Sequence, residues 1–292
     1  MITVPEAFAA AAVTRDGDAG RAWVRALPQL VAELCAEWRL VVDGPVLHGY
    51  LGLVIPVRRA SEPCALKVSW IDESTADEAA ALASWGGRGA VRLLEAQPAR
   101  GALLLERLDH TRSLATLEIG AAVAVAGGLL RRLAIPAPPG FRPLQEVVAR
   151  LERELPERWA QAGRPMPRRL LDRARALAAE LGASASGLLV NYDLHYDDVL
   201  AGRREPWLAV DPKVVAGDVE FGVAQLLWRR LEEMQAQGGL ERHFRALAEA
   251  AGLDLERARG WTLVRCVDYW LWGLSVGLTE DPARCATIID TL

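Results

Sequence analysis

The sequence predicts an α+β fold with two lobes, a small β-rich amino-terminal lobe and a larger helical carboxy-terminal lobe. Short apolar runs separated by glycine and proline gather before residue 107, as expected for the strands of a small sheet. After residue 108 the apolar residues recur mostly at helical spacing. A length of 292 residues is enough for two domains at about 150 residues each. We therefore place the lobes at residues 1–107 and 108–292.

The composition excludes several classes of protein. No apolar run reaches the roughly 18 residues of a membrane span, and no basic region precedes the alanine run near the start, as a secretory signal would require. A net charge of -4 argues against a nucleic-acid partner. We expect a cytoplasmic monomer with no membrane partner. Its cysteines, which form no C-x-x-C pair, are expected to be reduced thiols; they are Cys35, Cys64, Cys266 and Cys285.

In the first lobe, apolar residues near 3.6-residue spacing predict helices, and runs rich in Val, Leu and Ile predict strands. Gly49 and Gly52 flank a short turn, which predicts a hairpin with a glycine-containing tip. Ser74 or Thr75 suits the start of the second helix. The expected elements are a helix at 21–38, strands at 40–42, 53–57 and 65–70, a helix at 72–85, and strands at 90–94 and 102–105.

In the second lobe, two apolar stripes at helical spacing begin at Leu144 and Leu170. Gly182 follows the second stripe, where it suits a helix C-cap. The proline-rich segment 136–140 separates two of the helices. The expected elements are helices at 114–133, 144–155 and 170–181, strands at 188–190 and 207–211, and helices at 219–237, 240–251 and 255–278.

Three acidic residues follow the two short strands of the second lobe. Asp193 lies in the loop after the first strand, Asp198 follows five residues later, and Asp211 ends the second strand. Phosphoryl transfer from a nucleotide uses one carboxylate to orient and deprotonate the attacking hydroxyl, and two oxygen ligands for Mg²⁺. A hairpin whose turn is merely acidic remains an alternative. No G-x-x-x-x-G-K-[ST] motif occurs, so a P-loop nucleotide site is excluded.

Lysine is rare in this chain and occurs only at positions 67 and 213, against 32 arginines. Lys67 lies in a predicted strand, and Glu78 lies eleven residues later in the next predicted helix. Kinases hold the nucleotide phosphates with a strand lysine that pairs with a helix glutamate. Each residue alone could be an ordinary exposed charge. The order of hairpin, lysine, glutamate and three aspartates favours a phosphotransferase.

The chain resembles the aminoglycoside phosphotransferase family, in the branch of streptomycin 6-kinases and aminoglycoside/hydroxyurea resistance kinases. The resemblance covers nearly the whole sequence. It implies a protein-kinase-like fold and an ATP-dependent (or GTP-dependent), Mg²⁺-dependent enzyme that phosphorylates a hydroxyl of a cationic aminoglycoside-type antibiotic and so confers resistance. The segments that carry it are LPQLVAELCAEW, ALKVSW, ADEAAALASW, GAVRLLEA, ALLLERLD, DLHYDDVLAG, REPWLAVDPK and AGDVEFGVAQLLW.

The resemblance also implies roles for individual residues. Asp193 matches the catalytic aspartate, and Asp198 and Asp211 match the two metal ligands. Lys67 and Glu78 match the ion pair of the nucleotide lobe. The backbone of Glu106 and Leu108 matches the hinge strand that binds adenine.

Four positions depart from the family pattern. Asn191-Tyr192 replaces the usual His-Gly before Asp193, and Asp198 replaces the usual metal-binding Asn. Gly222 replaces the last acid of the Gly-Asp-Pro-x-x-Asp pattern. These departures motivate an alternative function, a kinase-like protein that binds nucleotide or a small molecule with little or no catalysis.

A polycationic acceptor requires carboxylates in its pocket. Asp268 lies on one helix face between apolar neighbours, where it must pair either with an arginine or with a ligand amine. Loop residues leave similar alternatives: His195 either holds the backbone or touches the metal site, and Lys213 forms a salt bridge or contacts a ligand. The candidate acceptor residues are Asp268, Asp197, Glu220, Trp270 and Trp272.

Overall fold

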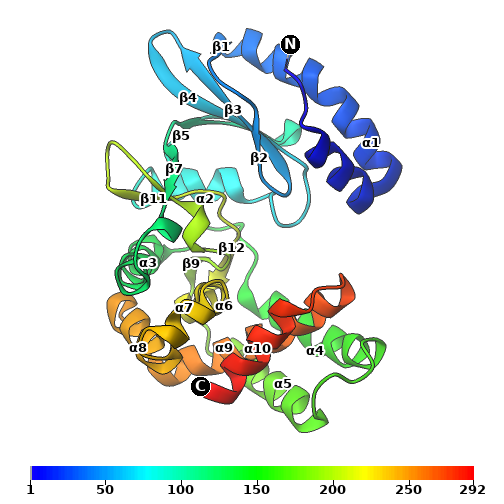
Figure 1. The fold of residues 1–292 in the computed structure, drawn as a ribbon, viewed down its shortest axis with the longest axis vertical. Coiled ribbons are helices and arrows are strands. Elements are labelled where there is room, and N and C mark those ends of the chain that lie inside the picture. Colours follow the sequence, from blue (N-terminus) through cyan, green and yellow to red (C-terminus); the bar gives the residue numbers. More distant parts are fainter. Residues whose placement is uncertain (1) are drawn as a thin grey trace. The chain divides into compact units, whose positions relative to one another are not determined.

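The structure is a computed structural model that describes residues 2–292. The chain divides into two compact units (Figure 1). The first unit comprises the chain up to residue 87 together with residues 91–108, and the second comprises residues 88–90 and 109–292. The first unit is built on a β-sheet and the second is mainly helical, which confirms the expected α+β class.

The first unit contains one antiparallel sheet with the strand order β1-β3-β4-β6-β5, and β2 pairs with β3. The hairpin predicted around Gly49 and Gly52 is the β2–β3 pair, in which Leu47 faces Val54. The elements are α1 (Glu6–Glu37), β1 (Leu40–Val42), β2 (Leu47–His48), β3 (Gly52–Arg59), β4 (Glu62–Ser69), α2 (Glu78–Trp85), β5 (Leu93–Gln97) and β6 (Ala102–Glu106).

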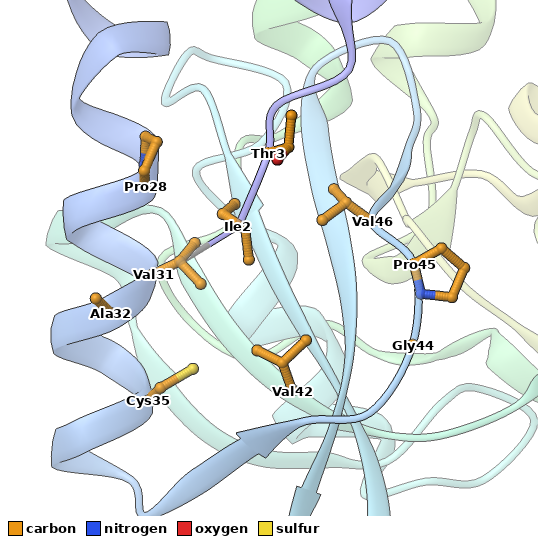
Figure 2. Close-up of a pocket in the computed structure, with 10 residues that line it drawn as sticks. All are labelled: Ile2, Thr3, Pro28, Val31, Ala32, Cys35, Val42, Gly44, Pro45 and Val46. Carbon is orange, nitrogen blue, oxygen red and sulfur yellow. The ribbon is translucent and has the colours of Figure 1, made fainter.

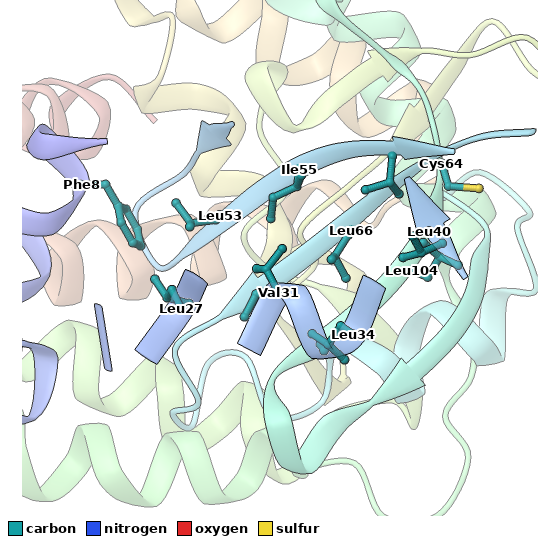
Figure 3. Packing of buried hydrophobic residues seen from close by; sticks show 13 residues of the cluster. Phe8, Leu27, Val31, Leu34, Leu40, Leu53, Ile55, Cys64, Leu66 and Leu104 are labelled. Carbon is teal, nitrogen blue, oxygen red and sulfur yellow. The ribbon is translucent and has the colours of Figure 1, made fainter. Parts of the chain in front are cut away.

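Helix α1 covers one face of this sheet (Figure 3). Leu27, Val31 and Leu34 recur at helical spacing on its buried side and meet Ile55 and Leu66 of the sheet. Each such side chain contributes about 1.5–3 kcal/mol when it is fully removed from water. The strand that carries Lys67 is therefore fixed by the unit's main apolar core, because Leu66 and Val68 on either side belong to it.

Several boundaries in the first unit differ from the sequence prediction. Helix α1 begins at Glu6 instead of residue 21, and it bends at Gly17, whose φ of 58° suits a residue without a Cβ. Helix α2 begins only at Glu78, because the Asp72 carboxylate accepts hydrogen bonds from the backbone N–H groups of Ser74 and Thr75 and holds that segment as a turn.

An apolar cavity of about 410 Å³ lies in the first unit, where α1 faces the segment after β1 (Figure 2). None of the candidate site residues lines it. The lining residues are Ile2, Thr3, Pro28, Val31, Ala32, Cys35, Val42, Gly44, Pro45 and Val46.

The second unit combines eight helices, within the part of the chain that the structure describes, with two three-stranded sheets of order β11-β10-β7 and β12-β9-β8. Its strands are β7 (Asp109–Ser113), β8 (Ile135–Pro136), β9 (Leu188–Asn191), β10 (Val199–Ala201), β11 (Trp207–Ala209) and β12 (Val214–Gly217). Its helices are α3 (Ile119–Leu133), α4 (Leu144–Gln161), α5 (Arg168–Ala183), α6 (Val223–Trp228), α7 (Leu231–Ala236), α8 (Leu240–Ala251), α9 (Leu255–Ser275) and α10 (Glu280–Thr291).

The second unit also corrects the prediction in places. Gly182 does not cap a helix; it lies inside α5, where a Cβ would come within 2.8 Å of the Val148 side chain. Its small size therefore serves the packing of α5 against α4. The helix predicted over 219–237 is divided into a 3₁₀ turn (Val219–Gly222), α6 and α7. No helix among residues 2–292 is long and apolar enough to cross a membrane.

Candidate active site

Asn191, two residues before Asp193, holds the loop that carries Asp193 in place. Strand β9 ends at Asn191, which pairs with Val214 of β12. The Asn191 side-chain oxygen accepts hydrogen bonds from the N–H of Asp193 at 3.2 Å and the N–H of Lys213 at 3.3 Å. The N–H of Tyr192 donates to the Lys213 carbonyl at 2.9 Å. Asn191, which departs from the family pattern, thus joins the Asp193 loop to the segment after Asp211.

Asp193 forms an ion pair with Lys213, whose Nζ lies 2.5 Å from the Asp193 Oδ2. Burial acts to lower the pKa of Lys213, but the charge and hydrogen bond of Asp193, helped by Asp211, outweigh it and hold this pKa above its usual value. The lysine is therefore a fixed positive charge beside Asp193. Of the two interpretations of Lys213, the structure shows the salt bridge.

Asp198 and Asp211 lie on adjacent segments of the same unit. The N–H of Val210 donates to the Asp198 carbonyl at 2.8 Å. Asp211 adopts a φ of 49°, an uncommon conformation for a residue with a Cβ and one often found at functional sites. The pKa of Asp198 is raised, mainly by burial and further by the charges of Asp211 and Asp193, while a hydrogen bond from His195 acts against the rise.

These carboxylates fit a magnesium site of the kinase type. Mg²⁺ bound to nucleotide takes one or two carboxylates, with phosphate oxygens and waters as its other ligands. Among residues 2–292 no cluster of three or more acids, histidines or cysteines forms a metal cage of its own. The His195 Nε2 lies 2.9 Å from the Asp198 Oδ2, so the histidine orients this carboxylate. The mutual repulsion of the three acids provides a reason for them to accept a cation.

In the first unit, Lys67 of β4 and Glu78 at the start of α2 form a buried ion pair. The Lys67 Nζ lies 2.7 and 2.6 Å from the two carboxylate oxygens of Glu78. Lys67 is 8% exposed and Glu78 is 3% exposed. A buried pair of this kind costs desolvation energy, so it is weak evidence for stability.

Glu106 and Leu108 lie at the carboxy-terminal end of the first unit. Glu106 ends β6, and its N–H donates to the Arg92 carbonyl at 3.0 Å while its carboxylate accepts from the N–H of Arg92. The Glu106 N–H is therefore used inside the unit. For hydrogen bonds to adenine, the groups that remain as candidates are the Glu106 carbonyl and the backbone of Leu108.

Asp218, within the modified Gly-Asp-Pro-x-x-Asp segment, is a buried structural anchor. It is 2% exposed and accepts hydrogen bonds from the Ser186 N–H, the Trp261 indole and the Arg257 guanidinium at 2.7, 2.8 and 2.7 Å. These contacts tie the segment after β12 to α9. Asp218 belongs to the motif AGDVEFG, but the motif alone indicates no role for it.

Gly222 approaches the catalytic loop closely. A Cβ at this position would lie 2.9 Å from the Asn191 carbonyl oxygen and 3.7 Å from the Tyr192 Cα. The backbone of Gly222 itself has an ordinary φ of −83°, so the constraint is space and not conformation. Gly222, where the family usually has an acid, therefore lies in close contact with the Asn191 loop.

Arg265 of α9 provides a second support for this loop, which sequence analysis had missed. Its Nη2 donates to the Tyr192 carbonyl at 3.3 Å. Its guanidinium lies over the rings of Phe221, Tyr192 and Trp228, at 4.8, 5.3 and 5.8 Å from their centroids. Cation–π contacts with three rings fix the arginine in place. The contact joins residues 73 positions apart, so the local sequence of α9 gives no signal for it.

The candidate acceptor residues are distributed over the second unit. The Asp268 carboxylate accepts from the Arg158 Nη1 of α4 at 2.7 Å, and Arg158 also donates to the Asp268 carbonyl at 2.8 Å. The structure thus shows the arginine alternative for Asp268. Trp272 is 43% exposed and stacks on Tyr269 with a centroid distance of 5.2 Å, while Trp270 is half-buried.

The two other acids differ in exposure. The side chain of Asp197 is 63% exposed and lies 3.7 Å from the His195 Nδ1. Glu220 accepts a hydrogen bond from the Asp254 N–H at 3.2 Å, and burial raises its pKa. Asp197 is therefore the more accessible charge for a cationic ligand.

Gly222→Ala should destabilise the protein and slow its reaction. The added Cβ must displace the Asn191 carbonyl, and overpacking of this kind costs typically about 1–3 kcal/mol. Urea unfolding and turnover would both be measured. Gly128→Ala is the matched control, since nothing lies within 4 Å of the corresponding Cβ on helix α3. Equal stability of the two variants would show that Gly222 is not under steric constraint.

The fold and the site define a protein-kinase-like class of phosphotransferase. Among solved structures, the aminoglycoside phosphotransferase APH(4)-Ia in complex with ADP and hygromycin B has a TM-score of 0.61 at 14% identity, covering 89% of this chain and 97% of its own. The choline kinase LicA of Streptococcus pneumoniae has a TM-score of 0.59 at 11% identity, covering 91% of this chain and 99% of its own. These likenesses concern the fold.

Sequence comparison identifies the family. Residues 37–277 match the aminoglycoside/hydroxyurea antibiotic resistance kinases, and the chain belongs to this family. It is 40% identical to a streptomycin 6-kinase of Streptomyces glaucescens over 97% of this chain and 95% of the relative. It is 43% identical to a hydroxyurea phosphotransferase of Kitasatospora aureofaciens over 100% and 86%. The family predicted from the sequence is confirmed, and the protein is a small-molecule kinase.

Proposed function

We propose that this kinase transfers the γ-phosphoryl group of ATP to a hydroxyl of an aminoglycoside-type antibiotic and thereby confers resistance. The observation that carries the proposal is the loop arrangement, in which Asn191 fixes Asp193 next to the acids Asp198 and Asp211. The relatives named above are kinases of streptomycin and hydroxyurea. The substrate class is an inference from them.

In the proposed reaction, Asp193 orients the acceptor hydroxyl and takes its proton as the oxygen attacks the γ-phosphorus. General-base assistance of this type is worth about 10² to 10⁴ in rate. Asp198 and Asp211 would hold Mg²⁺, which neutralises charge on the phosphates when bound. His195 keeps the Asp198 carboxylate oriented.

The first unit is proposed to bind the nucleotide. Lys67, held by Glu78, would contact the α- and β-phosphates. The Glu106 carbonyl and the Leu108 backbone would form hydrogen bonds with the purine base. Whether GTP can replace ATP as the phosphoryl donor is to be tested. We further propose that the protein works as a monomer in the cytoplasm.

For the acceptor, we propose Asp197 as the main acidic contact, with Glu220 as a second. Asp197 is exposed and lies four residues after Asp193. Trp270 and Trp272 are candidates to pack against sugar rings, because Trp272 presents an exposed face of the Tyr269 stack. Asp268 stays a candidate only if a ligand amine can replace Arg158.

A coupled ADP-release assay against a panel of aminoglycosides and hydroxyurea tests the proposed function. Transfer is expected with at least one antibiotic, together with a mass increase of one phosphoryl group on that compound. Nucleotide and drug binding without transfer would instead support the alternative, a kinase-like binding protein with little catalysis. That outcome would attribute the loss of catalysis to Asn191, Tyr192 and Gly222, the positions that depart from the family pattern.

Asp198→Asn should retain most of the transfer activity. An amide oxygen still ligates Mg²⁺, and Asn is the residue that the family usually has here. Asp211→Ala should lower activity by about 10²-fold or more, because a catalytic metal stabilises the transition state by several kcal/mol. Activity would be titrated with Mg²⁺ for both variants. A severe loss in Asp198→Asn would show that this site depends on the additional negative charge.

Asp268→Asn should lower the free energy of unfolding by about 0.5–1 kcal/mol and leave both Michaelis constants unchanged. The pair with Arg158 is only partly buried, so its contribution is discounted for solvent screening. Thermal unfolding and steady-state kinetics with ATP and the drug check this. A raised KM for the drug alone, with an unchanged melting temperature, would make Asp268 a substrate contact.

A further inference from the structure

The second lysine of the chain lies at the proposed reaction centre. Lys213 Nζ is 2.5 Å from the Asp193 Oδ2, and the Lys213 side chain is 27% exposed. An ammonium has three N–H donors, and the bond to Asp193 uses one of them. Two donors therefore remain for a second anionic oxygen next to Asp193.

The backbone holds Lys213 rigidly with respect to Asp193. The Lys213 N–H and the Asp193 N–H both donate to the Asn191 side-chain oxygen. The Lys213 carbonyl accepts from the Tyr192 N–H at 2.9 Å. Three hydrogen bonds therefore fix the backbone of Lys213 relative to Asp193, and the ion pair with Asp193 holds its ammonium.

The local charge explains why a cation is useful here. Asp193 contacts the Lys213 ammonium, and Asp211 lies two residues before Lys213 in the chain. The Asp198 carbonyl accepts a hydrogen bond from the N–H of Val210, the neighbour of Asp211. Three carboxylates repel a nucleotide triphosphate, and a phosphoryl transition state carries charge on its three equatorial oxygens. A fixed ammonium at this place offsets part of that repulsion.

The residue type agrees with such a role. Where the chain needs a positive charge it uses arginine 32 times and lysine at only two positions. The other lysine, Lys67, forms the buried pair with Glu78 in the first unit. A lysine ammonium is a compact point charge that suits a single phosphate oxygen, whereas a guanidinium is a wider planar fork.

We propose that Lys213 is a further catalytic residue, which binds the γ-phosphoryl group while it stays next to Asp193. The inference rests on the proposed function. In the step, the acceptor oxygen forms a bond to the γ-phosphorus, the bond from that phosphorus to the β–γ bridging oxygen breaks, and ADP leaves with the electron pair. The hydroxyl proton goes to Asp193, and Lys213 remains an ammonium throughout.

The test uses the two lysines as a matched pair. Lys213→Met and Lys67→Met would be compared with wild type in calorimetric titrations with ADP and with AMP-PNP, both with Mg²⁺. Lys213→Met should weaken AMP-PNP binding by about tenfold or more and leave ADP binding unchanged, since hydrogen bonds to charged groups contribute about that much. Lys67→Met should weaken both nucleotides to a similar extent.

A double variant separates a direct phosphate contact from the positioning of Asp193. If Lys213 touches the γ-phosphate, Lys213→Met should still weaken AMP-PNP binding relative to ADP binding in an Asp193→Asn background. The factor itself can differ between the two backgrounds, because the two residues are in direct contact. If Lys213→Met lowers turnover but changes AMP-PNP and ADP affinity equally or not at all, Lys213 only positions Asp193 and the proposal is wrong. If Lys213→Met does not fold, Lys213→Arg, which keeps the charge, takes its place. Lys213→Arg should keep the preference for AMP-PNP over ADP and transfer the phosphoryl group more slowly. Loss of that preference would overturn the proposal.

These outcomes also distinguish the proposal from the function on which it rests. If wild type binds neither nucleotide, the phosphotransferase proposal and the Lys213 role both fail. If wild type and Lys67→Met behave as expected and Lys213→Met retains the wild-type response to both nucleotides, only the Lys213 role fails.

Discussion

Asp193→Ala should lower turnover by about 10² to 10⁴ while ADP affinity stays close to that of wild type. The proposed base touches the acceptor hydroxyl and its loss removes general-base assistance, which has this magnitude. The nucleotide is held by other groups. The measurement is the coupled assay with saturating ATP and drug, together with calorimetry for ADP.

Asp197→Ala is the matched control for this prediction, because it removes a carboxylate four residues away on the same loop. It should raise the KM for the drug and keep turnover at saturating drug. Near-wild-type turnover in Asp193→Ala on a true substrate would show that the catalytic assignment is wrong.

Asp218→Ala should lower the free energy of unfolding by about 3–5 kcal/mol. The substitution leaves the Arg257 guanidinium without its carboxylate and removes the acceptor of the buried Trp261 indole and of the Ser186 N–H. Removing one partner of a buried ion pair typically costs this much. Urea unfolding followed by tryptophan fluorescence measures the change.

The control for this variant is Asp254→Ala at the start of α9, the helix that carries Arg257 and Trp261. Asp254 caps α9 by accepting a hydrogen bond from the Arg257 N–H at 2.8 Å, and loss of such a cap typically costs about 1 kcal/mol. If Asp218→Ala loses no more than Asp254→Ala, Asp218 is not the anchor that joins the segment after β12 to α9.

The parts of the fold that could be predicted from the sequence are those set by local patterns. Strand β4 and helix α2 follow from periodicity, so the positions of Lys67 and Glu78 on a strand and on the next helix could be stated in advance. The apolar stripe that begins at Leu144 likewise predicted helix α4. The predicted start of α2 was wrong, because the Asp72 carboxylate accepts the N–H groups of Ser74 and Thr75 and holds this segment as a turn.

The parts that could not be predicted depend on contacts between segments far apart in the chain. The Arg158–Asp268 pair joins residues 110 positions apart, and its formation depends on how α4 packs beside α9. The support that Arg265 gives to the Tyr192 carbonyl spans 73 positions. Local periodicity contains no information on either pair, since it describes which face of a helix is buried but not which residue lies opposite.

The close approach at Gly222 also constrains how this chain can evolve. Any side chain at 222 would meet the Asn191 carbonyl oxygen, and Asn191 is the residue that clamps Asp193 to Lys213. The fitness effect of a mutation at 222 therefore depends on the residue at 191 and on the loop conformation that it imposes, which is epistasis with a steric origin. An acid at 222 costs less stability after a change that moves this carbonyl, so one order of substitutions is favoured.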